Sequence, residues 1–513
     1  MEAPTTAGVT VVSESRTSTT RTAPAPRKPV DGPPVAAPPV RSPPRGAGRF
    51  VAVLPGLLML AIALIGAGRP VLSWDEVTSA EVASRSVPQI LDLIPNLDAV
   101  FGPYYLFLHF WTAVAGTGEI ILRLPSIIAM AGAVAIAAEL GRRLYDPAVG
   151  LVAGLLLCFV PNTSRYAAEA RPYAFACFFA ALAFLLLIEA ARQGGRRRWI
   201  WYGLSVLFLG LSHLIALTTL AAHLAHLLTN ARHRVRPWAA AVGLAILPVL
   251  PIAYLGTTQE DTQLHWVAPI TTGRIRDMAG EITGSREVAW LLIGLAVLAV
   301  WRPGRRLVPI AVYAIAPPAV VALVSALVSP MWVARYLLVV LAPLALLAAV
   351  ALLDGRTRYT IARTVAVLLM VAFVAIPGER AVRGATAKNG PDYRTIAQII
   401  GAGARPGDVV VYPDRNRAIR AGTSYYLRRQ PVAPADVLVE VPSAETGWLI
   451  AHEHPDAVAR VTGTPRIWLA VADRRDDPLT ARPDLRPLIT SGYHRIGFWQ
   501  PKSATVALYE KNP

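Results

Sequence analysis

The chain has 513 residues, of which 54% are hydrophobic and only 16% are charged. A soluble protein carries about 25% charged residues, so this composition excludes an ordinary soluble enzyme and indicates a chain that crosses a membrane several times. The formal net charge of +17 comes mostly from arginines in short clusters between apolar runs, which is typical of cytoplasmic loops and disfavours nucleic-acid binding. The two cysteines, Cys158 and Cys177, both lie in apolar runs, so the sequence predicts no disulfide framework.

The N-terminal segment is rich in Pro, Ser, Thr and Arg and has almost no large apolar side chains. It cannot bury enough surface to offset the entropy of ordering, so residues 1–49 are predicted to be a disordered tail. The first apolar run begins at Phe50, and the basic flank before it places the tail in the cytoplasm.

Apolar runs that could cross a bilayer then follow one another as far as residue 377. If the arginine clusters between them are all cytoplasmic, the chain has eleven spans, with its N-terminus inside and its C-terminus outside. If a further run at 103–116 also crossed the membrane, every later arginine cluster would face outward. This run is therefore predicted to lie on the outer surface as an interfacial helix. The predicted spans are 51–67, 123–141, 147–163, 171–191, 199–212, 213–229, 237–256, 288–301, 307–328, 335–353 and 360–377.

Hydropathy falls after the last predicted span, and short β-rich runs alternate with helical patterns. Residues 379–513 are therefore predicted to form a small extracytoplasmic α/β domain. Residues 50–378 are predicted to form the transmembrane domain, whose first outer loop covers residues 68–122. The predicted elements of the C-terminal domain are strands at 408–413, 466–473 and 504–512 and a helix at 393–404.

Two adjacent carboxylates, Asp75 and Glu76, lie just outside the first span on the predicted outer face. Ser73 or Asp75 could simply cap the helix that comes next, with Glu76 stabilised by the positive end of its dipole. The functional alternative is that Asp75 is a general base or a metal ligand, with its basicity raised by partial desolvation at the membrane surface. The residues alone leave both interpretations open.

Glu169 lies between Arg165 and Arg171 at another outer boundary, where charges are costly unless they are paired or bound. The three side chains form either a self-contained ion-pair network or a site in which the arginines hold a phosphate and Glu169 binds a metal or the sugar. Other phosphate-compatible side chains begin apolar runs at the same face, where each one alone is typical of an interfacial anchor. They are Arg123, His213, Arg335 and Tyr336.

In order and spacing, these motifs resemble the glycosyltransferases of the GT-C fold that use lipid-phosphate sugars. The resemblance is to family 39, which is related to protein O-mannosyltransferases and aminoarabinose transferases, and it covers about residues 51 to 378. It is carried by WDE (74–76), DAVFGPYYLFLHFW (98–111), RLPS (123–126), GRRLYD (141–146), EARPYA (169–174), His213, QLHWVAP (263–269) and ARYLL (334–338).

The resemblance implies an active site on the outer face, with Asp75 as the catalytic base and Glu76 beside it. A divalent cation, Mg or Mn, is a further candidate, with Asp75, Glu169 and His213 as its ligands. The implied contacts to the donor phosphate and sugar are Arg123, Arg165, Glu169, Arg171, Tyr173, His213, Arg335 and Tyr336. Those to the acceptor or the outer loop are Asp98, Tyr104, Tyr105, His265 and Trp266.

The implied reaction moves a sugar, mannose or arabinose, from a polyprenyl-phosphate-sugar in the plasma membrane to a hydroxyl of an envelope glycan, lipid or lipoglycan, or protein. The anomeric carbon would be inverted. The protein O-mannosyltransferase branch has an aspartate where this chain has Glu169, and an HPPL stretch where it has FGPYYL. These departures make actinobacterial envelope-type members the better match.

Two other functions compete with the transferase. A transporter or flippase for a lipid-linked sugar predicts ionisable residues near the middle of the membrane and discontinuous helices in matched halves. In this sequence the charges avoid the span centres, and no internal repeat is found. A non-catalytic scaffold would leave the cluster of Asp75 and Glu169 without a purpose.

Overall fold

A computed structural model gives the fold of the chain, which divides into two units, residues 1–44 and 45–513. All of the described helices and strands belong to the second unit. The predicted disordered tail, residues 1–49, lies almost wholly outside the described residues, as do Arg302, Arg305 and Arg356 of the arginine clusters. The described residues are 8, 10, 12, 13, 47–301, 304, 306–355 and 357–513.

The part of the second unit before residue 383 is helical, because an apolar chain in lipid satisfies its backbone groups within helices. Its elements are α1 (Ala47–Leu64), α2 (Trp74–Ala83), α3 (Val87–Leu93), η1 (Ala99–Phe101), α4 (Gly102–Ala115), α5 (Glu119–Leu144), α6 (Pro147–Cys158), α7 (Pro161–Ala167), α8 (Tyr173–Gln193), α9 (Arg196–Ser212), η2 (Leu214–Thr219), α10 (Leu220–Asn230), η3 (Arg232–Arg234), α11 (Val235–Ile246), η4 (Leu247–Val249), α12 (Leu250–Thr258), α13 (Glu260–Leu264), α14 (Thr272–Thr283), α15 (Arg286–Val300), α16 (Val308–Leu327), η5 (Ala334–Val340), α17 (Leu341–Leu353) and α18 (Thr360–Val382).

Within the described residues, six helical segments are long and apolar enough to cross a membrane, and eight are if each of two bent pairs counts as one span. The predicted polytopic helical architecture is therefore confirmed. Each of the eleven predicted apolar runs coincides with a helix or a helix pair, but several are short, so the count of eleven stays a prediction. The six segments are Glu119–Leu144, Tyr173–Gln193, Arg232–Thr258, Val308–Leu327, Ala334–Leu353 and Thr360–Val382, and the bent pairs are α6 with α7 (70°) and α14 with α15 (96°).

The helices pack closely around α5, which contacts α1, α6 and α8. Small residues allow this approach, as expected between helices in lipid. A Cβ atom on Gly150 of α6 would lie 2.3 Å from the carbonyl oxygen of Ala138 in α5, so only glycine fits there. The α5 helix also joins the two ends of the bundle, because its 26 residues span about 39 Å.

The C-terminal part of the second unit is an α/β domain, as predicted. Its main sheet has the order β1-β4-β6-β5; β1 and β4 are parallel, and the other neighbouring strands are antiparallel. The predicted strands correspond to β1, β4 and β6, and the predicted helix to α19. The elements are α19 (Tyr393–Gly403), β1 (Val409–Val411), α20 (Arg417–Leu427), β2 (Val439–Val441), β3 (His452–Glu453), α21 (Ala457–Val461), β4 (Arg466–Ala472), η6 (Pro478–Ala481), α22 (Arg486–Gly492), β5 (Tyr493–Trp499) and β6 (Ala504–Lys511).

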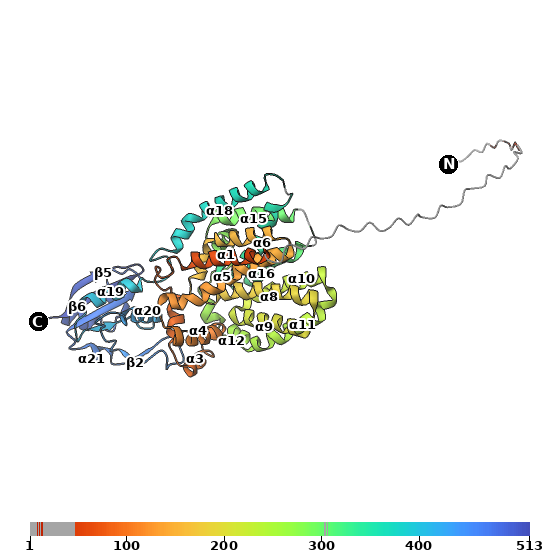
Figure 1. Cartoon of the computed structure of the whole chain (residues 1–513). Helices are drawn as coiled ribbons and strands as arrows, with labels where there is room; N and C mark the ends of the chain where they lie inside the picture. The colour runs from red at the N-terminus through yellow and green to blue at the C-terminus, as the bar shows by residue number, and fades with distance from the viewer. Residues whose placement is uncertain are drawn as a thin grey trace, which may run out of the picture. The chain divides into compact units, whose positions relative to one another are not determined.

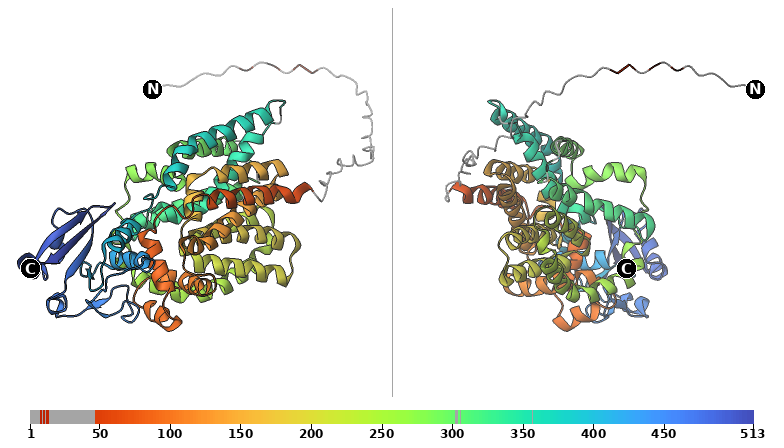
Figure 2. Two further views of the ribbon diagram at one scale, coloured as in Figure 1. Left: turned by 60° about the vertical axis from the view of Figure 1, so that its left-hand side comes forward. Right: turned by 90° about the vertical axis from the view of Figure 1, so that its right-hand side faces the viewer.

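The domain shares one hydrophobic core with the first outer loop. On one face of the sheet, Val410 and Trp468 belong to the same buried cluster as Ile396 of α19 and as Leu72 and Val77 of the loop. Helix α20 packs against α2, at the end of the bundle where α3 and α4 also lie (Figure 1). Figure 2 shows the strands farther from the helices than α19 and α20 are. The carboxyl-terminal loops of β1 and β4 are thereby brought to the outer loop.

Candidate active site

The N-terminus of α2 is fixed by a reciprocal pair of hydrogen bonds. The backbone N–H of Glu76 donates to Oγ of Ser73 over 3.2 Å, and the N–H of Ser73 donates to Oε2 of Glu76 over 3.0 Å. This is a capping box, which satisfies two helix-terminal donors. The capping interpretation of Ser73 thus holds, and because Ser73 and Glu76 form the cap, the carboxylate of Asp75 stays out of it.

Glu76 is fully buried and surrounded by donors. Arg123 donates from Nε to Oε1 over 2.8 Å and from Nη2 to Oε2 over 3.0 Å; Nζ of Lys388 lies 2.7 Å from Oε2, and the N–H of Ala170 donates to Oε1 over 3.0 Å. Arg123 also donates to backbone carbonyls in residues 67–71. Burial raises the pKa of Glu76, but the charges of Arg123 and Lys388 outweigh it and hold that pKa well below its usual value. This geometry favours positioning roles for Glu76 and Arg123 over the catalytic and phosphate-binding roles predicted for them.

Asp75 faces a cleft of about 790 Å³ that lies between the outer loops and the C-terminal domain. Its side chain is 36% exposed, and two guanidinium groups flank it. Nη2 of Arg171 lies 3.9 Å from Oδ1, and Nη1 of Arg335 lies 3.9 Å from Oδ2. Burial raises the pKa of Asp75, but the charges of Arg171, Arg335 and Arg417 lower it more. The predicted increase in the basicity of Asp75 is therefore wrong, because the charges of three arginines stabilise its carboxylate.

Arg171 is held by a chain of polar contacts on the floor of the cleft. Its Nη1 donates to the hydroxyl of Tyr105 over 3.3 Å, and that hydroxyl donates to Oδ2 of Asp98 over 2.7 Å. The guanidinium also lies over the ring of Phe101, 3.8 Å from its centre. Asp98 itself has a left-handed backbone, with φ of 57°. The predicted outer-loop residues Asp98 and Tyr105 thus orient Arg171 toward Asp75.

Behind Arg335 lies a group of aromatic side chains at the ends of α8, α9 and η5. The His213 ring is 5.8 Å from that of Tyr173 and 5.1 Å from that of Tyr336, measured between centres. The hydroxyl of Tyr173, Nδ1 of His213 and the Nε atoms of Arg335 and Arg171 are buried and make no hydrogen bond within the described part of the chain. Buried polar groups in proteins are nearly always paired, so these free polar atoms are suited to a ligand.

The chain is similar to one known protein family and to solved structures. A family described as "Dolichyl-phosphate-mannose-protein mannosyltransferase" matches residues 102–254. The structure of ArnT from Cupriavidus metallidurans bound to undecaprenyl phosphate is similar with a TM-score of 0.59 at 14% sequence identity, covering 90% of this chain and 98% of that one. The structure of the same protein in the apo state gives a TM-score of 0.60, with the same sequence identity and coverage. This chain has the GT-C fold.

The predicted GT-C fold is thereby confirmed, and the matching family is consistent with the predicted membrane glycosyltransferase. The oligosaccharyltransferase AglB from Archaeoglobus fulgidus, in complex with an inhibitory peptide and a dolichol-phosphate, gives a TM-score of 0.49 at 11% identity, covering 90% of this chain and 74% of that one. No protein with curated annotation matches the sequence significantly.

Other predicted residues of the GT-C site lie outside the cleft or at its edge. Glu169 is buried, and burial raises its pKa despite the charge of Lys388. Arg165 lies over the ring of Tyr166, 5.3 Å from its centre, and lines a small separate void. Tyr104 is buried with its ring 6.0 Å from that of Phe175. His265 and Trp266 line the cleft, and Arg335 lies 4.9 Å from the centre of the Trp266 ring.

The predicted metal ligands do not form a cluster. Among the residues that the structure describes, no three His, Cys, Asp or Glu side chains are grouped as a metal site requires. Asp75 instead has two guanidinium groups beside it, which repel a divalent cation. The residues present therefore do not fit a metal, and we assign no step to one.

Sequence reasoning missed one wall of the cleft. The loops after β1 and β4 contribute Arg415 and Arg475, Arg417 begins α20, and Trp448 lies on the same wall. In the sequence, charged runs lie at the carboxyl ends of two predicted strands, as DRNR at 414–417 and DRR at 473–475. Ligands bind outside the carboxyl ends of parallel strands, so this pattern was a usable signal.

Proposed function

We propose that this protein transfers a sugar from a polyprenyl-phosphate-sugar to an acceptor hydroxyl, with Asp75 as the general base. The observation that carries the proposal is the position of Asp75 in the cleft, 3.9 Å from each of two guanidinium groups. A carboxylate suits proton abstraction, and guanidinium suits a phosphate leaving group. The matching family is named for dolichyl-phosphate-mannose, and the similar ArnT structure holds undecaprenyl phosphate, which supports a lipid-phosphate donor.

In the proposed reaction the acceptor oxygen attacks the anomeric carbon while the bond from that carbon to the phosphate oxygen breaks. The acceptor proton passes to Asp75, and the lipid phosphate leaves with its bonding electrons. Attack opposite to the leaving group inverts the anomeric carbon. Arg171 and Arg335 stabilise the charge that develops on the phosphate, at sites fixed before the reaction begins. Tyr173 and His213, behind Arg335, supply further free polar groups.

Donor binding also changes the pKa of Asp75. The arginine charges hold the pKa of Asp75 below its usual value. A bound phosphate shares those charges, so the carboxylate loses part of its stabilisation and its pKa rises. Asp75 thus becomes a stronger base when the donor is in place.

We also propose the identity of the sugar, the class of acceptor and the side of the membrane on which the site lies. The sugar is mannose or arabinose, and the acceptor is an envelope glycan, a lipid or lipoglycan, or a protein hydroxyl. The site and the C-terminal domain face outward from the plasma membrane. The opposite end of α5 supports this sidedness, since Arg142 and Arg143 lie there, paired with Glu139.

The decisive experiment measures sugar transfer by purified protein from a panel of labelled polyprenyl-phosphate-sugars to an extract of membrane lipids and glycans. Asp75→Asn should lower turnover by about 10²- to 10⁴-fold while donor binding persists, because only the base is lost. Asp456→Asn is the matched control, since that carboxylate is 54% exposed in a surface pair with Arg460. Full turnover by Asp75→Asn would refute the base assignment, and no transfer from any donor by folded wild type would refute the function.

Sidedness is tested by labelling intact cells with an impermeant maleimide. Cysteine is introduced at Ser491, which is exposed in the C-terminal domain, or at His233, which is exposed in η3, after both native cysteines have been replaced by alanine. We expect labelling at position 491 only. Labelling at position 233 only would show that the protein has the opposite orientation in the membrane.

A further inference from the structure

The C-terminal wall of the cleft is built as a ligand-binding edge. Parallel strands β1 and β4 end there, and their following loops carry Arg415 and Arg475 into the cleft. The backbone is left-handed at Arg415 (φ 58°), in the loop between β1 and α20, and at Asp473 (φ 68°), directly after β4. Such conformations cost free energy in non-glycine residues and cluster at ligand sites. These features indicate that this wall of the cleft itself contacts a ligand.

Three large aromatic rings line the same cleft without being buried by the protein. Trp74, Trp266 and Trp448 are 49%, 50% and 44% exposed. Exposed apolar surface gathered in one cleft marks a binding site. The Trp74 ring packs directly against Gly390, where a Cβ would lie 1.9 Å from it, so only glycine leaves room for the ring.

Trp448 is held from its backbone rather than from its ring. Its carbonyl accepts a hydrogen bond of 2.8 Å from Nη2 of Arg85, and its N–H donates to Oγ1 of Thr446 over 3.1 Å. Arg85 in turn forms a pair with Glu81 at the end of α2. These contacts join the backbone of Trp448 to the end of α2, the helix that also carries Asp75.

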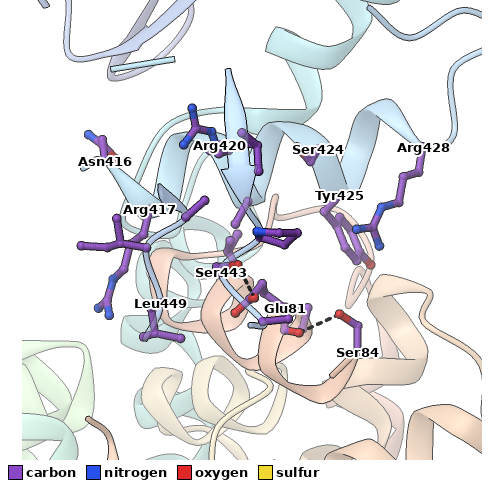
Figure 3. A pocket seen from close by; sticks show the side chains of 18 residues that line it. Glu81, Ser84, Asn416, Arg417, Arg420, Ser424, Tyr425, Arg428, Ser443 and Leu449 are labelled. Carbon is purple, nitrogen blue, oxygen red and sulfur yellow. Dashed lines mark hydrogen bonds between the residues drawn. The ribbon is translucent and has the colours of Figure 1, made fainter. Parts of the chain in front are cut away.

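A second cavity of about 360 Å³ continues from the cleft along α2 and α20. The two cavities share Arg417 and Leu449 among their lining residues. Arg417 and Leu449 lie at one end of the second cavity, and Tyr425 and Arg428 lie at the other (Figure 3). Cavities of about 300–1,000 Å³ each hold a drug-sized molecule, so the pair has room for a chain of several units.

We infer that the acceptor is a saccharide chain, with sugar rings stacked on Trp74 and Trp448 and the chain continuing into the second cavity. This inference rests on the proposed function. The electron-rich faces of indole rings attract the weakly positive C–H groups on one side of a sugar ring. Guanidinium donors of Arg417 and Arg428 match sugar hydroxyls. A peptide acceptor would more simply add to a strand edge, but the residues that line the cleft all lie outside the strands, and Val439 of β2 is the one strand residue among those that line the second cavity.

The test compares Trp448→Ala with the matched control Trp499→Ala in the full-length protein. Trp499 is 37% exposed on β5 and does not line either cavity. Binding is followed by saturation-transfer NMR with manno- and arabino-oligosaccharides of increasing length, and the acceptor KM is measured beside the donor KM. We expect wild-type affinity to rise with chain length. Trp448→Ala should lose about tenfold for the longer chains and leave the donor KM unchanged, whereas Trp499→Ala should match wild type.

The outcomes separate this inference from the proposed function. Transfer by wild type together with an unchanged acceptor KM in folded Trp448→Ala overturns the saccharide site alone. Binding of a Ser/Thr-rich peptide in place of every oligosaccharide also overturns it. Length-dependent saccharide binding that needs Trp448, without transfer from any donor, supports the saccharide site and refutes the transferase. Trp448→Tyr, which keeps a ring, should retain most of the affinity and covers the case that the alanine variant does not fold.

Discussion

Glu76 and Arg123 form a two-pronged ion pair, with Nε 2.8 Å from Oε1 and Nη2 3.0 Å from Oε2, and neither side chain is exposed to solvent. The pair joins the start of α2 to the start of α5. Because Asp75 precedes Glu76 in the same helical turn, the buried pair sets where the Asp75 carboxylate points. The adjacent acids thus have different tasks, one holding the loop and the other facing the cleft.

Replacing Glu76 with Gln should destabilise the protein strongly. The change leaves Arg123 and Lys388 as buried cations without their counter-ion, and breaking a buried pair costs about 3–5 kcal/mol. The measurement is the melting temperature in detergent. Asp477→Asn, which removes a surface pair with Arg486, should cost about 1 kcal/mol or less. Equal melting temperatures for the two variants would contradict the anchoring role.

Replacing Gly390 with Ala should impair turnover without unfolding the protein. The new Cβ would lie 1.9 Å from the Trp74 ring, so Trp74 and the following Asp75 must shift. A displacement of about 1 Å at a reacting group costs on the order of a hundredfold in rate. Gly463→Ala is the control, because Gly463 also has a positive φ (+84°) but has nothing within 4 Å. Equal kcat/KM in the two variants would contradict the prediction.

The pH profile should report the charges beside Asp75. The carboxylate accepts a proton only when ionised, so kcat/KM falls as the pH drops through its pKa, which the arginines hold below the ordinary value of 3.8. Arg335→Gln removes one of these charges, raises the pKa of Asp75 and should move the acidic limb to higher pH. Arg335→Lys keeps the charge and should leave the acidic limb of the kcat/KM profile near its wild-type pH. An acidic limb that does not move in Arg335→Gln would show that another group controls it.

Transfer should persist in the presence of a chelator. The two guanidinium groups at Asp75 supply the positive charge that the leaving phosphate needs, and Asp75, Glu169 and His213 are not grouped as ligands among the described residues. The measurement compares initial rates with and without EDTA. Loss of activity that added Mg or Mn restores would instead support the cation predicted from the sequence.

The sequence alone determined the class of molecule and much of its site. Composition and arginine spacing predict a polytopic membrane protein because the bilayer imposes hydropathy and charge rules on every span. The polar side chains that begin apolar runs predict a site at one face, since helices that start at one interface bring those residues to one level. Asp75, Arg171 and Arg335 do meet there.

Only the tertiary structure decided which of these polar residues face the cleft. Adjacent residues on a helix point in different directions, so Glu76 enters the core while Asp75 meets solvent, and no local pattern separates the two. Arg123 and Lys388 are 265 residues apart in sequence yet both reach Glu76. Trp448 and Arg475 approach Asp75 only because the sheet packs through α19 and α20 onto the first outer loop. Such contacts depend on long-range packing, which periodicity and spacing do not encode.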